Sequence, residues 1–284
     1  MTAITADGSS RTVDLDGFRL HYHDIGDGPV LLLLHGGGPG ASGWSNFKQN
    51  VPALSEHFRL LLVDQPGFGR SDKPVHDTPQ HALTASKIVG LLDHLGIDKA
   101  TPVGNSMGGA ASLELALEHP DRVDRLILMA PAGGCLPITS QPSAESRILF
   151  TYYAPPGPSV ERTKALFHAL AHDASGVPDE TFAERYEASI DPEAMAYNGR
   201  MFRNWGKLGP QHWKRVNEIA HDTLILWGRE DKVLPLDGAL HMTHQMRNAR
   251  LVVFPNCGHW CQLEVARDFE TEIIHFMARA DAHR

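Results

Sequence analysis

The sequence predicts an α/β protein, with a mostly parallel β-sheet covered by helices on both faces and interrupted by a helical insertion. Two observations favour this fold class. Short, continuously apolar runs alternate with amphipathic helical stretches in the first half of the chain. This alternation stops after Gly134 and returns near residue 222. Continuous apolar strands that alternate with helices are typical of a parallel sheet buried on both sides.

The elements of the first half follow in chain order. Three apolar runs predict strands, and a fourth strand of poor composition is assigned from its context: they are 29–38 (PVLLLLHGGG), 58–69 (FRLLLVDQPGFG), 123–134 (VDRLILMAPAGG) and, from context, 99–105 (KATPVGN). Two stretches with apolar residues at helical spacing predict helices: they are 81–97 (HALTASKIVGLLDHLGI), which ends at Gly96, and 108–120 (GGAASLELALEHP), which Pro120 stops.

The chain between Leu136 and Trp213 is rich in proline and then helical, and it has no convincing strand. Residues 160–173 and 179–190 are amphipathic helix candidates there. Strands are predicted again at 222–231 and 249–260, before a final helix. That helix places four apolar side chains on one face: Phe269, Ile273, Phe276 and Met277. We therefore divide the chain into a core (1–135), a helical cap insertion (136–213) and the second part of the core (214–284).

Composition excludes several classes of function. The chain has 284 residues and a net charge of −8, which argues against nucleic acid or an anionic membrane as a partner. Its longest strongly apolar run, Val30–Leu34, is far below the roughly 20 residues of a membrane helix. Three cysteines and a polar N-terminus without a signal peptide predict a protein of the reducing cytoplasm.

Neither a metal nor a nucleotide is expected. Cys257 and Cys261 flank His259, but no second matching cluster completes the roughly four ligands of a structural zinc site. The glycine loop His35–Gly40 (HGGGPG) lacks the lysine and hydroxyl residues of a phosphate-binding loop.

The stretch Gly104-Asn105-Ser106-Met107-Gly108 has the form G-x-S-x-G between a predicted strand and a predicted helix. A nucleophilic serine on a strained strand-to-helix turn needs small neighbours, and glycines flank Ser106 on both sides. The plain alternative is a tight turn with no catalytic role. Motif and context together favour Ser106 as a nucleophile.

Such a serine needs a base and an acid that follow it in the order Ser, Asp or Glu, His. Asp231 lies just beyond one late strand, and His259 lies in the loop after the last one. Separately, Asp231 or Glu230 fits a turn residue and His259 fits a core histidine. Their occurrence in order favours a triad in which His259 takes the proton and Asp231 orients its ring.

An oxyanion site needs backbone N–H donors. The residue after the nucleophile, Met107, supplies one donor in such turns. The glycine loop supplies the second, from Gly37 or Gly38, because glycine lets the backbone approach a substrate closely.

On these residues the chain resembles the α/β-hydrolases along essentially its whole length. It resembles more narrowly the meta-cleavage product hydrolases, which cut a carbon–carbon bond. Six segments carry this resemblance: HGGGPGASGWSNF, VDQPGFGRSD, VGNSMGG, LILMAPAGG, WGREDKVLPLDGAL and CGHWCQLE. It implies an eight-stranded α/β-hydrolase sheet with an inserted cap, and a homodimer or larger homo-oligomer.

The resemblance also implies the reaction. The expected substrate is an anionic 2-hydroxy-6-oxo-hexa-2,4-dienoate from aromatic or steroid ring catabolism, cleaved at C5–C6 without a cofactor to a 2-hydroxypenta-2,4-dienoate and a carboxylic acid. Arg185 matches the family's carboxylate-binding arginine, and Asn46, Asn105 and Trp260 match positions at the polar end of the site. The plain alternatives are a solvated Arg185 paired with Glu184 or Glu187, an Asn105 that only braces the turn, and a Trp260 that packs in the core.

Two other functions remain open from the sequence. A carboxylesterase or lactonase would use the same triad, although an apolar ester would not need Arg185 and Asn105. A catalytically silent binding protein would have no use for an intact Ser106, Asp231 and His259. The group on C6, whether alkyl, phenyl or steroid-derived, is not readable from the sequence.

Overall fold

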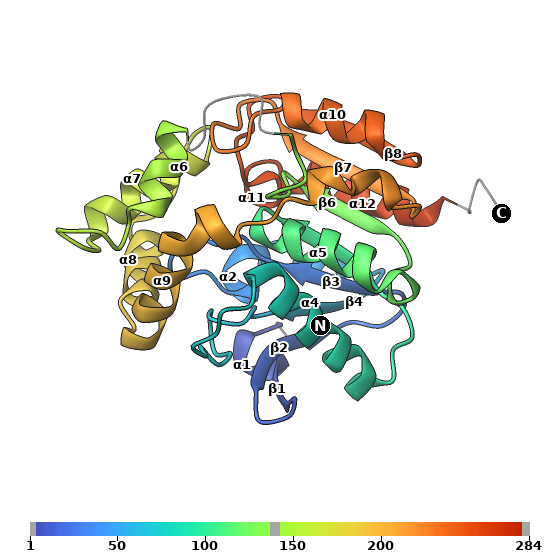
Figure 1. The fold of residues 1–284 in the computed structure, drawn as a ribbon, viewed down its shortest axis with the longest axis horizontal. Helices are drawn as coiled ribbons and strands as arrows, with labels where there is room; N and C mark the ends of the chain where they lie inside the picture. The colour runs from blue at the N-terminus through green and yellow to red at the C-terminus, as the bar shows by residue number, and fades with distance from the viewer. Residues whose placement is uncertain (1–3, 137–142, 280–284) are drawn as a thin grey trace.

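The computed structural model describes residues 4–136 and 143–279, and in them eight strands form one sheet (Figure 1). The strand order is β1-β2-β4-β3-β5-β6-β7-β8. The strands are β1 (Ser10–Asp14), β2 (Arg19–Ile25), β3 (Val30–Leu34), β4 (Arg59–Val63), β5 (Thr101–Asn105), β6 (Leu126–Met129), β7 (Thr223–Gly228) and β8 (Ala249–Phe254). β2 pairs antiparallel with β1 and β4, and all other pairs are parallel. The predicted mostly parallel, eight-stranded sheet is therefore confirmed.

Helices cover both faces of this sheet (Figure 1). The α-helices are α1 (Ala6–Ser9), α2 (Gly43–Phe47), α3 (Val51–Leu54), α4 (Gln80–Leu95), α5 (Met107–Glu118), α6 (Ala144–Phe150), α7 (Val160–Leu170), α8 (Asp179–Ser189), α9 (Pro192–Leu208), α10 (Asp237–Gln245), α11 (Cys261–Glu264) and α12 (Ala266–Ala278). The short 3₁₀ helices are η1 (Pro120–Arg122), η2 (His212–Lys214) and η3 (Val216–Glu218).

The apolar run of β3 shows why the sheet is covered twice. Successive side chains of a strand point to opposite faces. Leu31 and Leu33 pack with α3 and α12, whereas Leu32 and Leu34 pack with α4 and α5. All four leucines are fully buried, which only helices on both faces can achieve.

The parallel register brings the carboxyl ends of six neighbouring strands, β4, β3, β5, β6, β7 and β8, to one edge of the sheet. Leu34 at the end of β3 pairs with Gly104 of β5, and Asn105 pairs with Met129 of β6. On the other side, β7 and β8 end together at Gly228 and Phe254. Loops that follow these strands therefore meet at one place, where open α/β sheets bind ligands.

Helices α6 to α9 lie in the chain between β6 and β7, and Figure 1 shows them together beside this edge of the sheet. Serine or aspartate side chains cap three of them, at Ser143, Ser159 and Asp191. The stretch 137–142, which lies within the predicted insertion, is outside the described residues. We propose 136–213 as the cap, between core segments 1–135 and 214–284. No helix among residues 4–136 and 143–279 is long and apolar enough to cross a membrane.

Candidate active site

Ser106 occupies a strained turn between β5 and α5. Its backbone has φ 52° and ψ −111°, a region that residues with a side chain rarely adopt. Three backbone hydrogen bonds fix this turn: Ser106 N donates to Met129 O, and Ser106 O accepts from Ala110 N and Ala132 N. Within β5 and the first turn of α5 every other residue is buried, so Ser106 alone there is partly exposed.

The glycines on either side of Ser106 are required by close packing. A Cβ atom on Gly104 would lie 2.4 Å from the Gly108 carbonyl oxygen. A Cβ atom on Gly108 would lie 2.1 Å from the Leu34 carbonyl oxygen of β3. Both distances are far below contact, so the G-x-S-x-G pattern reports the geometry of this turn.

Asp231 and His259 meet as the sequence predicts. His259 Nδ1 lies 2.7 Å from Asp231 Oδ2, and both side chains are buried. The other carboxylate oxygen, Oδ1, accepts hydrogen bonds from Val233 N and Leu234 N, at 2.8 and 3.0 Å. The neighbouring Glu230 instead accepts from Cys257 N. One carboxylate oxygen of Asp231 therefore bonds the backbone of its own loop, and the other bonds His259.

The Ser106 hydroxyl makes no hydrogen bond to the His259 ring, although both residues are described. Asn105 links the turn of Ser106 to the loop of His259, because its Nδ2 donates to the His259 carbonyl oxygen at 3.1 Å. Catalytic hydrogen bonds of this kind are often long in ligand-free enzymes and tighten when substrate binds. His259 Nε2, the nitrogen that Asp231 leaves free, is the one available to the serine.

Glu264 holds the loop around His259, a role that the sequence analysis missed. Its carboxylate accepts from Gly258 N at 3.0 Å and from Trp260 N at 3.1 Å, on both sides of the histidine. It also accepts from His172 N after α7, and His259 N donates to Leu170 O. Burial raises the pKa of Glu264. The signal available in the sequence was an acidic residue shortly after His259.

The glycine loop after β3 lies against the turn of Ser106. A Cβ atom on Gly37 would lie 3.2 Å from Met107 Sδ, and one on Gly38 would lie 3.0 Å from an Arg185 guanidinium nitrogen. Met107 is the first residue of α5, so its N–H has no partner within the helix. The N-terminus of α5 also carries a partial positive charge that favours an oxyanion. The glycine loop therefore lies between Met107, in the turn of Ser106, and the Arg185 side chain.

His35 fixes the start of this loop. The ring is fully buried: its Nε2 accepts from Gln65 N at 3.1 Å, and its Nδ1 lies 2.8 Å from the Gly36 carbonyl oxygen. One nitrogen accepts and the other donates, which requires a neutral ring. Burial lowers the pKa of His35 to about 4.

Acid should therefore destabilise the protein through His35. Because its pKa is about 4 when folded and about 6.5 when unfolded, the unfolded chain binds the extra proton between these values. The contribution of His35 to the free energy of unfolding is intact above pH 6.5 and is lost as pH falls toward 4. Between pH 7 and pH 5 the free energy of unfolding should fall by about 2 kcal/mol through this residue. Urea unfolding at pH 7 and pH 5 measures this change. The free energy of unfolding should fall more in wild type than in His35→Gln. An equal loss in both proteins would contradict it.

Arg185 is buried on α8, whereas its neighbours Glu184 and Glu187 are both exposed. Its Nε donates to Pro39 O at 2.6 Å and one terminal nitrogen donates to Ser45 Oγ at 3.0 Å. Among the described residues it has no carboxylate partner, so the pairing with Glu184 or Glu187 considered above does not form. Burial lowers the pKa of Arg185 to about 10, which leaves it charged at neutral pH.

Three further residues of the sequence-based site are buried nearby. Asn105 donates to His259 O and to Met129 O, so its amide braces the turn, and its Oδ1 has no hydrogen-bond partner among the described residues. The Asn46 amide donates to Ser42 O at the start of α2. Trp260 packs edge-on against Phe167 of α7, with ring centroids 5.0 Å apart. The bracing role of Asn105 and the packing role of Trp260 are therefore both present.

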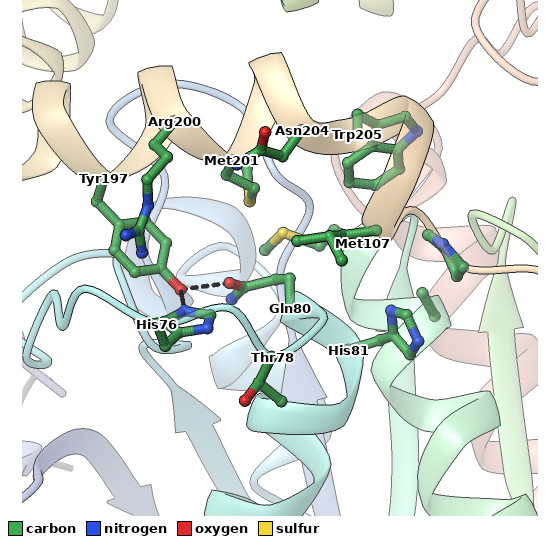
Figure 2. A pocket seen from close by; sticks show the side chains of 13 residues that line it. His76, Thr78, Gln80, His81, Met107, Tyr197, Arg200, Met201, Asn204 and Trp205 are labelled. Carbon is green, nitrogen blue, oxygen red and sulfur yellow. Dashed lines mark hydrogen bonds between the residues drawn. The ribbon is translucent and has the colours of Figure 1, made fainter.

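Two cavities are lined in part by residues of the sequence-based site. The larger, about 850 Å³, is lined by Asn46, Arg185 and Trp260. The smaller, about 40 Å³, lies between α9 and the core, and Figure 2 shows Met107 in its wall beneath Met201. Neither lining includes Ser106 or His259. The chain neighbours of these two residues, Met107 and Trp260, face one cavity each.

Comparisons with known proteins match most of the chain. The model of the alpha/beta hydrolase fold family matches residues 29–266. The chain is 41% identical, over 93% of each chain, to a 2-hydroxy-6-oxononadienedioate/2-hydroxy-6-oxononatrienedioate hydrolase of Comamonas testosteroni. It is 40% identical, over 93% of each, to a 2-hydroxy-6-oxo-6-phenylhexa-2,4-dienoate hydrolase of Burkholderia cepacia.

A solved structure is similar over nearly the whole chain. It is a meta-cleavage product hydrolase from Pseudomonas fluorescens IP01, a serine-to-alanine mutant with acetates. The TM-score is 0.86 at 33% identity, covering 94% of this chain and 97% of the other.

Proposed function

The chain belongs to the α/β-hydrolase fold family and, within it, to the meta-cleavage product hydrolases, and we propose that its reaction runs through Ser106, His259 and Asp231. It is a serine hydrolase that cleaves the C5–C6 bond of a 2-hydroxy-6-oxo-hexa-2,4-dienoate. Further proposed roles are the oxyanion donors Met107 and Gly37 or Gly38, and the substrate contacts Asn46, Asn105, Arg185 and Trp260.

One observation carries the choice of an anionic substrate. Arg185 is buried and charged, and none of the described residues offers it a carboxylate. A buried charge without a counter-ion is costly, so arginines in such places usually have an anionic partner. The planar guanidinium suits a bidentate grip on a carboxylate, and Arg185 lines the large cavity. A neutral ester would leave this charge unpaired, which disfavours the esterase or lactonase alternative.

The first half of the proposed reaction prepares the bond for cleavage. Arg185 and Asn105 hold the carboxylate and the 2-hydroxy end of the dienol, which converts to its keto tautomer with His259 as the proton carrier. The C5–C6 electron pair can then leave as a conjugated dienolate. The buried Oδ1 of Asn105 is an acceptor without a partner among the described residues, and this supports its assignment to the substrate's hydroxyl.

The second half transfers the acyl group. His259 Nε2 takes the Ser106 proton as the serine oxygen attacks the C6 carbonyl, and the oxyanion lies on N–H groups of Met107 and the glycine loop. The C5–C6 bond breaks, the fragment leaves as the conjugated dienolate, and its C2 oxygen receives the proton from His259, which gives the 2-hydroxypenta-2,4-dienoate. Water, deprotonated by His259, then attacks the acyl-enzyme and releases the carboxylic acid. No step uses a metal or an organic cofactor.

The cellular setting and the assembly are also proposals. Three free cysteines, two of them buried, are consistent with the cytoplasm. The family resemblance supports a homodimer or a larger homo-oligomer, which light scattering on the purified protein would measure. A monomer would contradict it.

Replacement of Arg185 tests the proposed substrate class. Arg185→Gln should lower kcat/KM for a dienoate by about 10²–10³-fold, since each charge-assisted hydrogen bond contributes roughly 1.5–3 kcal/mol. Turnover of a neutral aryl ester, if any, should change by less than about fivefold, because it has no carboxylate to pair. Dienolates are coloured, so loss of absorbance measures the reaction for substrates with methyl, phenyl or carboxyethyl groups on C6.

Two further variants make this test specific. Arg185→Lys keeps the charge but loses the planar pair of guanidinium donors. Its kcat/KM for the dienoate should lie between those of wild type and Arg185→Gln. Arg203→Gln removes an exposed arginine of α9 and should leave kcat/KM unchanged. An equal loss on dienoate and ester in Arg185→Gln would mean that Arg185 only supports the loop. Strong ester turnover by wild type without dienoate turnover would overturn the carbon–carbon reaction.

A further inference from the structure

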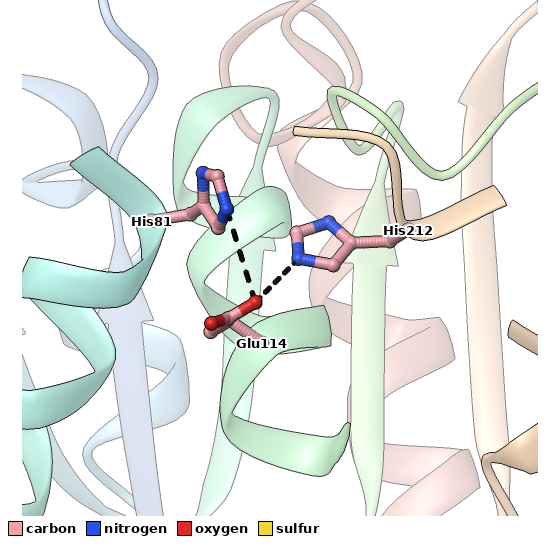
Figure 3. A group of neighbouring side chains, drawn as sticks. All are labelled: His81, Glu114 and His212. Carbon is pink, nitrogen blue, oxygen red and sulfur yellow. Dashed lines mark hydrogen bonds and ion pairs between the residues drawn. The ribbon is translucent and has the colours of Figure 1, made fainter. Parts of the chain in front are cut away.

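A second cluster of chemistry-bearing side chains lies away from the proposed triad. His81 at the start of α4, Glu114 on α5 and His212 on η2 converge on one point (Figure 3). Their nearest ligand atoms all lie within 4.8 Å of one another. His212 Nε2 is 2.8 Å and His81 Nε2 is 3.8 Å from the same oxygen of Glu114, Oε2. The mechanism above uses none of the three.

This donor set is that of a transition-metal site. Two imidazoles and one carboxylate are ligands of zinc and of similar divalent ions. Ligands about 2.0–2.1 Å from a tetrahedral zinc lie roughly 3.4 Å apart, between the two distances measured here. Small movements of the two rings would bring the three atoms to that spacing. Three ligands also leave one position open for water.

The bonding around Glu114 leaves room for a cation. Its carboxylate oxygen Oε2 has two imidazole rings as partners, those of His81 and His212. The nearby cation, Arg215, is bonded to Glu118 and Glu218 and does not bond Glu114.

We propose that His81, Glu114 and His212 form a binding site for a divalent transition-metal ion of the zinc type. The His212 side chain is 6% exposed, and its Nε2, which lies 2.8 Å from Glu114 Oε2, is the nitrogen that would bind the ion. His81 also lines the small cavity beside Met107 (Figure 2), and its volume of about 40 Å³ has room for metal-bound water.

The site would join three parts of the chain. His212 follows shortly after the end of the cap helix α9, whereas His81 and Glu114 belong to two core helices. Glu114 also lies on α5, two turns beyond Met107. A bound ion would therefore connect η2, which follows the cap helix α9, to the core helices α4 and α5. It would also stabilise the folded state by mass action.

Calorimetry with Zn²⁺ on chelator-treated, desalted protein tests the proposal. Wild type should bind one ion per chain, and at about 100 times the dissociation constant the melting temperature should rise by about 5 °C. His81→Ala and Glu114→Gln should each weaken binding by more than about 100-fold, because each removes one of three ligands. Glu114→Gln keeps the side-chain shape, so a loss of binding there does not reflect unfolding.

His94→Ala is the matched control, since it removes an exposed histidine from the same helix α4 and should bind as wild type does. An anomalous difference map at the zinc edge should place the ion between the three side chains. Failure of wild type to bind at millimolar Zn²⁺ would overturn the proposal. So would unchanged binding by His81→Ala, which would mean that zinc binds elsewhere, for example at the cysteines. In either case the cluster is only an ion pair within the protein.

Discussion

Ser106→Ala should lower kcat for a 2-hydroxy-6-oxo-dienoate by about 10⁴-fold or more while the protein folds as before. The variant keeps the turn, because alanine adds no atom to it, but it has no oxygen to attack the C6 carbonyl. A 10⁴-fold loss corresponds to about 5.5 kcal/mol in the activation barrier. The remaining activity would come from the oxyanion donors and from substrate binding. Absorbance of the dienoate, followed over hours, measures the loss.

Ser112→Ala is the matched control for this result. Ser112 is buried further along α5, and its hydroxyl donates to the Gly108 carbonyl oxygen. Its loss should change kcat by less than about tenfold, because it contacts no reacting group. A serine-directed phosphonate should also label wild type and not Ser106→Ala. Near-normal turnover by a folded Ser106→Ala protein would exclude the acyl-enzyme route, and a folded wild type that is never labelled would favour the silent binding protein.

The turn of Ser106 was predictable because its chemistry and its packing depend on residues close together in sequence. A Cβ atom on Gly104 or Gly108 would lie within 2.4 Å of a backbone carbonyl oxygen, so the motif itself reports the geometry. The strand before it was less evident. Residues 99–105 have a poor strand composition, and β5 forms because β3 and β6 pair with it on both sides. Context therefore decided that element, as tertiary pairing overrides local propensity.

The hairpin of β1 and β2 was not assigned from the residues, and only the family resemblance implied eight strands. Its strands carry histidine and arginine rather than long apolar runs. His21 and His23 are buried all the same, because His21 Nδ1 lies 2.8 Å from Asp64 and His23 Nδ1 lies 2.9 Å from the Ser9 hydroxyl. Polar side chains that find such partners can be buried, and a pattern of apolar residues does not reveal them.

The surroundings of Arg185 could not be read from its neighbours in the chain. Spacing alone allowed a pairing with Glu184 or Glu187, one turn or less away. The structure instead buries Arg185 against Pro39 and Ser45, which precede it by about half the chain. The same applies to the histidine–glutamate cluster of Figure 3, which three separate elements bring together. Only the fold creates such contacts, so sequence patterns are silent about them unless a family resemblance supplies them.

Asp231→Asn should lower kcat/KM by about 10³–10⁴-fold with little change in stability. The reason lies in the two backbone donors that face Asp231 Oδ1, Val233 N and Leu234 N. They require an acceptor, so the introduced amide would turn its oxygen toward them and its NH₂ toward His259. Nδ1 would then have to accept a hydrogen bond, and the proton would reside on Nε2. In that tautomer His259 cannot take a proton from Ser106.

Glu230→Gln is the control, because this adjacent carboxylate bonds Cys257 N and Arg229 instead of His259. It should keep kcat/KM within about fivefold of wild type, as expected for a group that holds only a loop. Two further measurements distinguish a wrong His259 tautomer from misfolding of the variant. Asp231→Asn should melt within a few degrees of wild type, and Ser106 should react with the phosphonate far more slowly, because the same base is missing. Activity within tenfold of wild type would mean that His259 keeps its tautomer without Asp231, and the triad assignment would have to be replaced.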